Sequence, residues 1–509
     1  MKRLAITGSI LTLCLLLLAG CIQPAPDARP WLLDETATIP PEELPTQPAP
    51  AVTLPTQRPP DSPYYTPTPD QPRTLPTLRA EEDTYLVQAG DSLAIIANAY
   101  NLPLEVLLAA NPLENPNALE VGQAITIPTL TPSVASSAFK IIPDSELVYG
   151  PVSSTLDILA FIAAQGGHLA SYSDTVDEES LSGAEVVSRV AAEFSVNPRL
   201  LLAVLEYRSN WVTSKKGTST SEDFPIGFVN PNYKGLYLQL AWLANQLNRG
   251  FYLYQINALA YIVLDEGKVS FLDPTLNAGT AAVQYALGQN SSSEAWRTSV
   301  SEEGLYQTYS ELFGIPFDLT FEDLLPADLQ QPALELPFEK GSEWSFTGGP
   351  HAGWGTGSAW AALDFAPPGD EFGCFKSDAW VTAVADGVIV RSENGEVVQD
   401  LDGDGLEQTG WTILYMHVGA LERVKAGTRV KTGDRIGHAS CEGGITNGTH
   451  LHLARRYNGV WISADVGLPF VLSGWTSAGD GEEYSGTLTK DDRVVYSWNG
   501  RVDENQIGH

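Results

Sequence analysis

Basic residues, cysteine and histidine are scarce in this 509-residue chain. Only 29 Lys and Arg stand against 62 Asp and Glu, so the formal net charge is -33. Phosphate contacts require clustered Lys and Arg, and the composition therefore excludes nucleic-acid binding. After the first residues no stretch is apolar enough to cross a bilayer. The chain is also longer than one hydrophobic core requires, so we expect several domains.

The first 21 residues have the pattern of a targeting segment. Lys2 and Arg3 precede an apolar run from Ile6 to Leu18, which is too short for a comfortable membrane span. The run ends in Leu18-Ala19-Gly20-Cys21, which resembles the bacterial lipobox. This resemblance implies a lipid on Cys21 and a protein tethered outside the cytoplasmic membrane. The alternative is an ordinary secretory signal with an incidental cysteine.

Two segments have the composition of linkers. Residues 22–82 are rich in Pro and Thr and contain few large apolar side chains. Such a segment cannot bury enough surface to offset chain entropy, so we expect an extended spacer that reaches from the membrane into the cell wall. Residues 130–154 are expected to form a second linker.

Residues 83–129 form a compact βααβ pattern between these linkers. A strand at 85–88 is followed by helices at 93–100 and 104–110 and a closing strand at 123–128. Val87-Gln88-Ala89-Gly90-Asp91-Ser92-Leu93, Asn111-Pro112 and Val121-Gly122-Gln123 are similar to the motifs of LysM domains. The resemblance implies binding of N-acetylglucosamine-containing glycan near Gly90, Asp91, Ser92 and residues 113–116. A small domain without a ligand is the alternative.

Residues 155–335 have helical periodicity, as in Val187, Val190, Ala191 and Phe194. The stretch 197–205 faintly resembles the helix that leads to the catalytic glutamate of lysozyme-like transglycosylases. The expected Glu-Ser pair is replaced by Arg208-Ser209, and arginine cannot donate a proton to a glycosidic oxygen. Glu206 is two residues away and would face elsewhere on a helix. We therefore expect an all-α, catalytically inactive domain that acts as a spacer or, alternatively, a glycan cradle.

The strongest chemical signal is the run Gly448-Thr449-His450-Leu451-His452-Leu453. Side chains alternate along a strand, so two histidines one residue apart would point to the same face. Such a pair could hold a metal ion and a catalytic base side by side. A His-x-His pair by itself is also compatible with ordinary polar strand positions.

Three further residues strengthen this signal. His351 and Asp364 lie thirteen positions apart, and His417 ends the apolar run Ile413-Leu414-Tyr415-Met416, which is typical of a buried strand. Two imidazoles, one carboxylate and a bound water are the usual composition of a catalytic zinc centre with an open position.

Residues 338–475 resemble the lysostaphin-like (M23) zinc endopeptidases, which have a mainly antiparallel β fold and cut peptidoglycan cross-links. The resemblance rests on His450-Leu451-His452, Tyr415-Met416-His417 and the two strand-turn-strand segments 381–388 and 430–437. It implies that His351, Asp364 and His452 bind zinc and that His417 and His450 assist catalysis.

One position departs from the common His-x-x-x-Asp motif, because Trp360 stands four residues before Asp364. The staphylolytic and β-lytic branch of the family has a longer spacing, which His351 fits. The alternative is that His351 only lines the substrate groove. Residues 476–509 form a C-terminal extension.

Two other features lie near these histidines. Cys374 and Cys441 are the cysteines that remain after export, and such a pair outside the cytoplasm predicts a disulfide. Asp400, Asp402 and Asp404 have the oxygen spacing of the first half of a calcium loop. Trp411 occupies the position where an EF-hand needs a bidentate glutamate, so a surface acidic turn is favoured over a Ca²⁺ site.

The chain is thus predicted to be a membrane-tethered, extracytoplasmic zinc endopeptidase with peptidoglycan as its partner. His450 or His417 would act as the general base, and sequence alone does not divide the two roles. The opposed hypothesis is a catalytically silent wall-binding protein that positions or activates another hydrolase. The complete set of site residues favours the enzyme.

Overall fold

The fold was analysed in a computed structural model. It describes residues 69–75, 81–88, 91–100, 102, 104–113, 115–116, 119–216, 222–322 and 324–509. The predicted targeting segment with Cys21, most of the spacer and Gly90 lie outside the described residues. No helix in these described ranges is long and apolar enough to cross a membrane.

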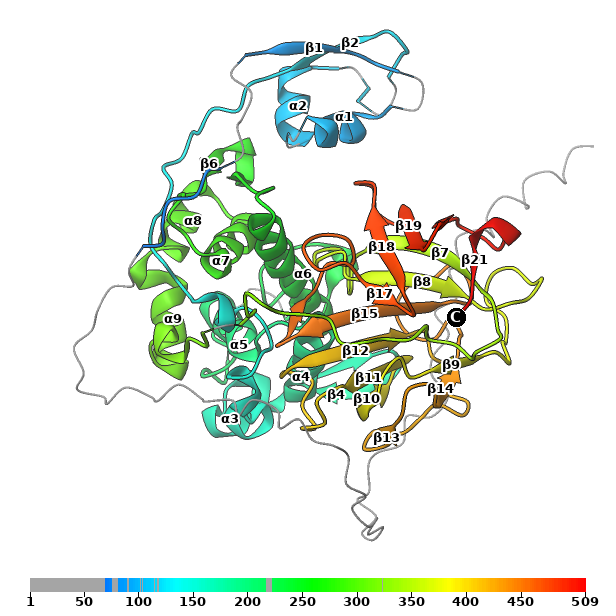
Figure 1. The fold of residues 1–509 in the computed structure, drawn as a ribbon. Helices are drawn as coiled ribbons and strands as arrows, with labels where there is room; N and C mark the ends of the chain where they lie inside the picture. The colour runs from blue at the N-terminus through cyan, green and yellow to red at the C-terminus, as the bar shows by residue number, and fades with distance from the viewer. Residues whose placement is uncertain are drawn as a thin grey trace, which may run out of the picture.

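The first folded unit confirms the βααβ prediction. It consists of β1 (Asp83–Leu86), α1 (Leu93–Ala99), α2 (Leu104–Ala110) and β2 (Ala124–Ile127), with β1 and β2 paired antiparallel (Figure 1). Its own small core includes Leu93, Ile96, Leu107, Ile125 and Ile127. Asn111 ties the end of α2 to β2, because its amide donates to the Leu107 and Thr126 carbonyls and accepts from the Thr126 N–H. The unit therefore has a separate hydrophobic core.

Both flanks of this unit are attached to the helical domain. On the N-terminal side, the backbone N–H groups of Asp70 and Arg73 donate to the carbonyls of Thr275 and Pro274. On the C-terminal side, residues 133–134 hydrogen-bond to Val269 in strand β6 (Val269–Phe271). At least residues 70–73 of the predicted extended spacer are therefore held against a folded surface.

The predicted linker at 130–154 is wrong for most of its length. Ile141, Ile142, Leu147 and Val148 are completely buried in the core of the helical domain. The segment also forms short 3₁₀ turns at Asp144–Glu146 and Ser153–Thr155. Its apolar residues lack a regular period, which explains why a linker was expected.

The middle domain is mainly helical, but it is not all-α. Two hairpins accompany the helices, β3–β4 (Ser173–Val176, Glu179–Ser182) and β5–β6 (Tyr261–Val263, Val269–Phe271). The helices are α3 (Ile158–Gln165), α4 (Gly183–Phe194), α5 (Pro198–Ser209), α6 (Leu236–Gln255), α7 (Ala278–Gly288), α8 (Ser293–Ser299) and α9 (Gln307–Phe313).

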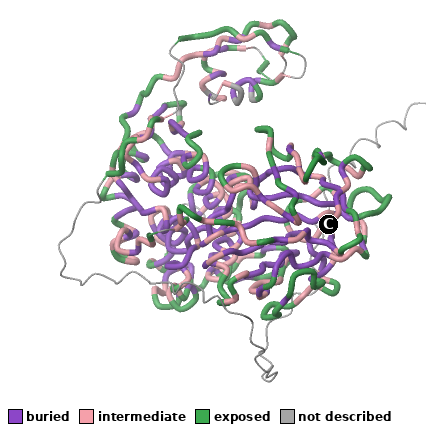
Figure 2. The backbone as a smooth tube through the Cα atoms, viewed as in Figure 1, coloured by how far each residue is buried: buried purple, intermediate pink, exposed green. Residues whose placement is uncertain are grey.

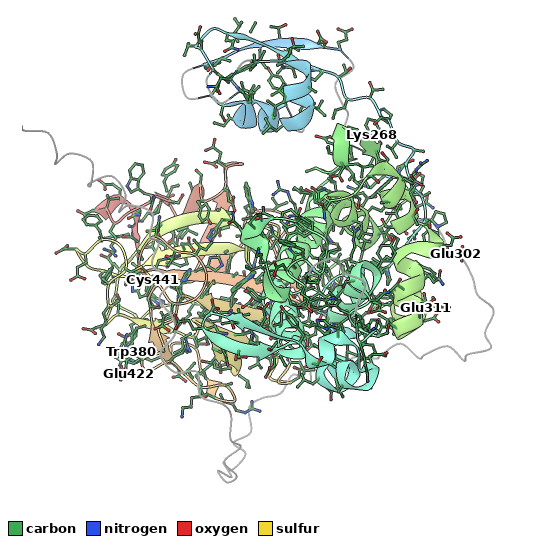
Figure 3. The ribbon with its side chains drawn as sticks, turned by 180° about the vertical axis from the view of Figure 1, so that it is seen from behind. Lys268, Glu302, Glu311, Trp380, Glu422 and Cys441 are labelled. Atoms are coloured by element: carbon green, nitrogen blue, oxygen red, sulfur yellow. A yellow bond between two sulfur atoms is a disulfide. The ribbon has the colours of Figure 1, made fainter. Side chains whose placement is uncertain are left out.

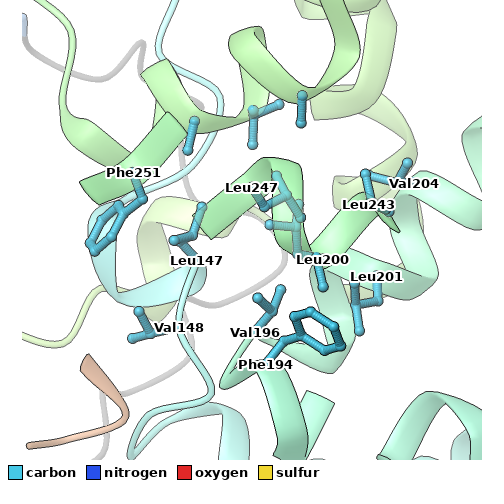
Figure 4. Close-up of a cluster of buried hydrophobic side chains, with 14 of the residues drawn as sticks. Leu147, Val148, Phe194, Val196, Leu200, Leu201, Val204, Leu243, Leu247 and Phe251 are labelled. Atoms are coloured by element: carbon cyan, nitrogen blue, oxygen red, sulfur yellow. The ribbon is translucent and has the colours of Figure 1, made fainter. Parts of the chain in front are cut away.

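Local sequence explains two of these helix starts. Ser182 and Glu185 form a capping box at α4, and Asn197 caps α5 with Pro198 in the first turn. Apolar side chains of α5 and α6 then meet in the domain core, where Leu200, Leu201, Val204, Leu243 and Leu247 cluster (Figure 4).

The residues that suggested an inactive glycosidase are structural. The guanidinium of Arg208 donates to the Leu287 carbonyl and to the Ser291 hydroxyl. Glu206 accepts hydrogen bonds from the N–H groups of Val212 and Thr213, so its carboxylate caps a turn. The lysozyme-like prediction is not confirmed by this arrangement.

The last domain is built on an antiparallel sheet with the order β13-β10-β11-β12-β15-β8-β7-β21, and β16 pairs with β15 (Figure 1). This confirms the predicted mainly antiparallel β fold of this domain. The strands of the sheet are β7 (Trp344–His351), β8 (Ala362–Ala366), β10 (Gly387–Glu393), β11 (Glu396–Asp400), β12 (Trp411–Met416), β13 (Arg429–Val430), β15 (Leu451–Tyr457), β16 (Val460–Trp461) and β21 (Gln506–Ile507).

The C-terminal extension is part of this domain. β21 completes the sheet beside β7, and a second sheet follows the order β17-β18-β19-β20. The latter strands are β17 (Val471–Leu472), β18 (Trp475–Gly479), β19 (Gly486–Lys490) and β20 (Arg493–Tyr496). A small sheet pairs β9 (Trp380–Thr382) with β14 (Arg435–His438).

The helical domain and the large sheet share one hydrophobic core. Ala362, Val398, Leu414 and Trp461 of the sheet belong to the same buried cluster as the side chains of α4 to α7. Buried chain runs continuously from the helices into the sheet in Figure 2. The helices are therefore packed on the sheet that holds the candidate site.

Candidate metal centre

The strand order brings the predicted site residues together. Asp364 in β8 and His452 in β15 are direct cross-strand partners. His351 is the last residue of β7, on the other side of β8. His417 follows the last residue of β12, and Met416 of that strand pairs with His452. His450 immediately precedes β15, so all five predicted residues lie in, or directly next to, four neighbouring strands.

Three donor atoms converge on one point. The Nε2 of His351 lies 3.0 Å from the Nδ1 of His452 and 3.2 Å from Oδ1 of Asp364. The Nδ1 of His452 is also 3.2 Å from Oδ1 of Asp364. All three side chains are buried. Atoms this close to one another can all reach one ion at the about 2.0–2.2 Å usual for zinc ligands.

Backbone carbonyls determine which histidine nitrogens face this point. The Nδ1 of His351 is 2.8 Å from the Gly349 carbonyl, and the Nε2 of His452 is 3.0 Å from the Gly353 carbonyl. A carbonyl can only accept, so these nitrogens carry the hydrogens. Each ring therefore directs a lone pair at the other ring and at Asp364, whose buried Oδ1 has no hydrogen-bond donor among the described residues. Three lone pairs at this distance repel one another unless a cation lies between them, so the residues fit a metal ion.

The pKa shifts of His351 and Asp364 also show that positive charge is favoured at this site. Burial acts to lower the pKa of His351, but the Asp364 carboxylate beside it outweighs burial and raises the pKa. Burial acts to raise the pKa of Asp364, yet the neighbouring histidines hold it well below its usual range. The carboxylate is therefore ionised at neutral pH and ready to bind a cation.

His417 and His450 form a second pair beside the three donors. Their ring centres are 4.5 Å apart, and Nε2 of His450 lies 3.7 Å from Oδ1 of Asp364. Their Nδ1 atoms donate to the carbonyls of Glu442 and Gly448, at 3.0 and 2.8 Å. Both Nε2 atoms are therefore acceptors. Burial, reinforced by His450 and His452, lowers the pKa of His417 to about 3, so this ring is neutral at pH 7.

The backbone at His417 is strained. Its φ is 65°, in the left-handed region that non-glycine residues adopt uncommonly, although histidine enters it more often than most. The Ser440 N–H and hydroxyl both donate to the His417 carbonyl, which holds the residue in this conformation. Strain that the surroundings maintain at such a position is typical of functional residues.

Sequence reasoning missed Tyr484, which comes from the C-terminal extension. Its ring stacks on His351 with centroids 4.2 Å apart, and its side chain remains 53% exposed. Its backbone pairs with the segment before His351, because the Gly349 N–H donates to the Tyr484 carbonyl and the Tyr484 N–H to the Pro350 carbonyl. No sequence motif connects two residues this far apart in the chain. The only available signal was that residues 476–509 had been given no role.

The predicted disulfide between Cys374 and Cys441 is present, with a sequence separation of 67 (Figure 3 labels Cys441). It joins the loop after β8 to the loop that leads to His450. The Thr449 hydroxyl also donates to the Phe375 carbonyl across these loops. The disulfide therefore restrains the two loops relative to each other, including the one that leads to His450.

We expect the double variant Cys374→Ser, Cys441→Ser to lower the free energy of unfolding by about 4 kcal/mol, because a long loop is no longer closed in the unfolded chain. The measurement is denaturant unfolding of parent and variant without reductant. As a control, reductant should move the parent curve toward that of the variant. Equal stability of the two proteins would show that the bond does not constrain the unfolded state.

The acidic turn does not support the Ca²⁺ prediction. Asp400, Asp402 and Asp404 do cluster. However, their carboxylates accept hydrogen bonds from the turn itself, including the N–H groups of Gly405 and Leu406. The favoured alternative, an acidic turn, agrees with this arrangement.

Three family models match the chain. They are described as the LysM domain (residues 85–128), the LasA N-terminal domain (residues 140–326) and peptidase family M23 (residues 369–464). The chain therefore contains a LysM domain and an M23 peptidase domain, and its helical domain is of the LasA N-terminal type. The M23 match includes His417, His450 and His452, but it begins after His351 and Asp364.

Two curated relatives agree with these matches. Protease LasA of Pseudomonas aeruginosa (strain UCBPP-PA14) is 23% identical over 340 residues, which are 63% of this chain and 74% of that protein. Secreted LysM effector ECP6 of Passalora fulva is 46% identical over 46 residues, 9% of this chain and 20% of that protein.

Solved structures of M23 proteins are also similar. The M23 metalloprotease pseudoalterin from the deep sea is 24% identical with a TM-score of 0.28, and the match covers 34% of this chain and 97% of that one. The catalytic domain of lysostaphin from Staphylococcus simulans is 25% identical with a TM-score of 0.18, covering 24% of this chain and 89% of that one.

Proposed function

We propose that this chain, which contains an M23 peptidase domain and a LysM domain, is a zinc endopeptidase that hydrolyses peptide bonds in peptidoglycan cross-links. The carrying observation is the convergence of His351, Asp364 and His452, with both imidazole tautomers determined by backbone carbonyls. A cation is the species that this arrangement suits, because three lone pairs face one point. We assign these three residues as the metal ligands.

Zinc at this site would polarise the scissile carbonyl and lower the pKa of a bound water toward about 7. The chain's own residues supply the proton transfer. The Nε2 atoms of His417 and His450 both accept, and their carbonyl-bound Nδ1–H groups keep the rings oriented. One ring takes the proton of the attacking water at Nε2 and returns it to the departing amine nitrogen. The other ring, once it has gained a solvent proton at Nε2, donates a hydrogen bond to the oxyanion.

Tyr484 is placed to take part in substrate binding. Its ring covers one face of His351 while half of the side chain faces solvent. The backbone pairing of residues 349–350 with Tyr484 holds the ring there. We propose that this ring forms one wall of the groove in which the cross-link peptide lies.

The function is tested by removing zinc from the full chain and adding it back. The purified protein should contain one zinc per chain and release peptide fragments from cross-linked peptidoglycan. Chelation should stop the release, and added zinc should restore it. A chain that binds one zinc and leaves every peptidoglycan type intact would instead support the silent wall-binding protein.

The remaining domains suggest where the enzyme acts. We propose that the LysM domain binds wall glycan through Asp91, Ser92 and the neighbouring Gly90. The Asp91 carboxylate accepts hydrogen bonds from the Tyr85 hydroxyl and the Gln88 N–H, so it also shapes this turn. We further propose a lipid on Cys21, which would anchor the protein to the outer side of the bacterial membrane.

Deleting residues 83–129 should abolish most co-sedimentation with purified peptidoglycan, because the glycan-binding turn is removed. Hydrolysis of a small soluble cross-link peptide should change little, since the site lies in another domain. Both quantities are measured on the parent and the deletion variant. Unchanged sedimentation of the deletion variant with several wall types would contradict the LysM assignment.

A further inference from the structure

The loop between His351 and Asp364 is held by a residue of the helical domain. Asn245 in α6 accepts hydrogen bonds at Oδ1 from the N–H groups of Thr356 and Gly357, at 2.9 and 2.8 Å. Its Nδ2 donates to the Thr356 hydroxyl at 2.8 Å. One amide side chain thus satisfies three polar groups of a loop that connects two candidate metal ligands.

The loop lies directly against the helix. A Cβ on Gly357 would lie 2.0 Å from the backbone carbonyl oxygen of Asn245. A Cβ on Gly355 would lie 2.6 Å from Oδ1 of the Asn245 side chain. Gly355 also has a φ of 62°. Glycine at both positions therefore permits the close approach, and the contact is specific to this loop sequence.

The same loop carries the carbonyl that orients His452. The Gly353 carbonyl accepts from Nε2 of His452, and the Gly353 N–H donates to the Ala359 carbonyl, which closes the loop. A Cβ on Gly353 would lie 2.6 Å from the Trp461 ring. Trp461 is itself held by α6 and the end of α4, through the Tyr252 hydroxyl and the Phe194 carbonyl.

We propose that Asn245 is a positioning residue for the metal centre and that the helical domain thereby forms part of its outer support. The line of contacts runs from Asn245 to the loop at 355–357, then to the Gly353 carbonyl and to the His452 ring. A loop released from α6 no longer holds the Gly353 carbonyl in place, and the His452 tautomer that presents Nδ1 is no longer favoured. The inference rests on the proposed metal centre.

The test compares Asn245→Leu with Asn245→Asp in the full chain. Aspartate retains an oxygen that can accept both loop N–H groups, whereas leucine accepts none. We expect the zinc dissociation constant to rise 10- to 100-fold in Asn245→Leu, the range typical for outer-shell changes, and only a few-fold in Asn245→Asp. Zinc affinity is measured by chelator competition, with Gln246→Ala as the matched control on the same helix.

A spectroscopic measurement separates positioning from general stability. In the metal-free parent, ¹⁵N NMR should show His452 with its hydrogen on Nε2, and Asn245→Leu should show a mixture of tautomers. Asn245→Ala takes the place of Asn245→Leu if leucine prevents folding. By reciprocity, zinc should also slow hydrogen exchange at the Thr356 and Gly357 amides of the parent.

Equal zinc affinity and an unchanged His452 tautomer in the folded leucine or alanine variant would overturn the inference. Unchanged hydrogen exchange at the Thr356 and Gly357 amides of the parent on zinc binding would overturn it as well. An Asn245→Asp variant that binds zinc as weakly as Asn245→Leu would also overturn it. These outcomes differ from failure of the proposed function, in which the parent itself binds no zinc or binds zinc without hydrolysing peptidoglycan.

Discussion

Replacing His452 by alanine is expected to remove both the bound metal and the hydrolytic activity. His452 supplies one of three donor atoms that lie 3.0–3.2 Å from one another. Without it, two protein ligands remain, whereas catalytic zinc sites usually require three. The Asp364 carboxylate would also lose one of the neighbours that hold its pKa down. Bound zinc is measured by elemental analysis, and hydrolysis by release of peptides from peptidoglycan.

His438→Ala is the matched control for this prediction. The His438 ring lies against Trp380, with ring centroids 3.9 Å apart, and its Nε2 is 3.2 Å from Oε2 of Glu422. Its loss therefore removes an imidazole that is not part of the candidate metal centre. The control should keep one zinc per chain and parental activity. If His452→Ala retained one zinc per chain, the assignment of His452 as a ligand would be wrong.

Replacing His417 by alanine should leave zinc in place while turnover falls by about 10²- to 10⁴-fold, the usual contribution of a general acid or base. His417 is not one of the three converging donors, and its ring centre lies 6.4 Å from that of His452. Its ring is neutral, and Nδ1 faces the Glu442 carbonyl, so Nε2 is the nitrogen that carries the lone pair. The measurement is kcat on a soluble cross-link peptide together with zinc content.

Two results distinguish the possible roles of His417. A drop in kcat and in kcat/KM by the same factor identifies an interaction made only in the transition state. Loss of zinc from His417→Ala would place His417 among the metal ligands and would contradict our assignment. The variant also places alanine at a backbone φ of 65°, which alanine adopts less readily than histidine, so its unfolding curve should be recorded beside that of the parent.

Much of the candidate site could be predicted because its motifs are local. His450 and His452 flank one residue of a strand, so alternation alone places them on one face. His417 stands at the end of an apolar run that forms β12. The partnership of His351 with Asp364 depended on the resemblance to a family, since the twelve intervening residues can adopt many paths. The loop closes through Asn245, which belongs to a different domain.

The features that sequence analysis missed or misassigned also depend on contacts between distant segments. Residues 141–148 have no regular apolar period, so the complete burial of their apolar side chains beside α7 could not be recognised. Tyr484 reaches His351 only because strands β18 and β19 carry the turn between them to the end of β7. The helical domain suggested a degenerate glycosidase because one helix pattern is shared by many folds. Arg208 and Glu206 then proved to be engaged with neighbouring backbone.

The sequence alone determined the residue types of the site, the βααβ unit and the order of the domains, because strand alternation, turn residues and caps act over a few positions. The tertiary structure decided which nitrogens of His351 and His452 face the point where the three donor atoms converge, through the carbonyls of Gly349 and Gly353. It also decided that the helical domain and the C-terminal extension contribute contacts to the site. Those contacts join residues more than a hundred positions apart, and their formation depends on the packing of whole domains, which no local pattern encodes.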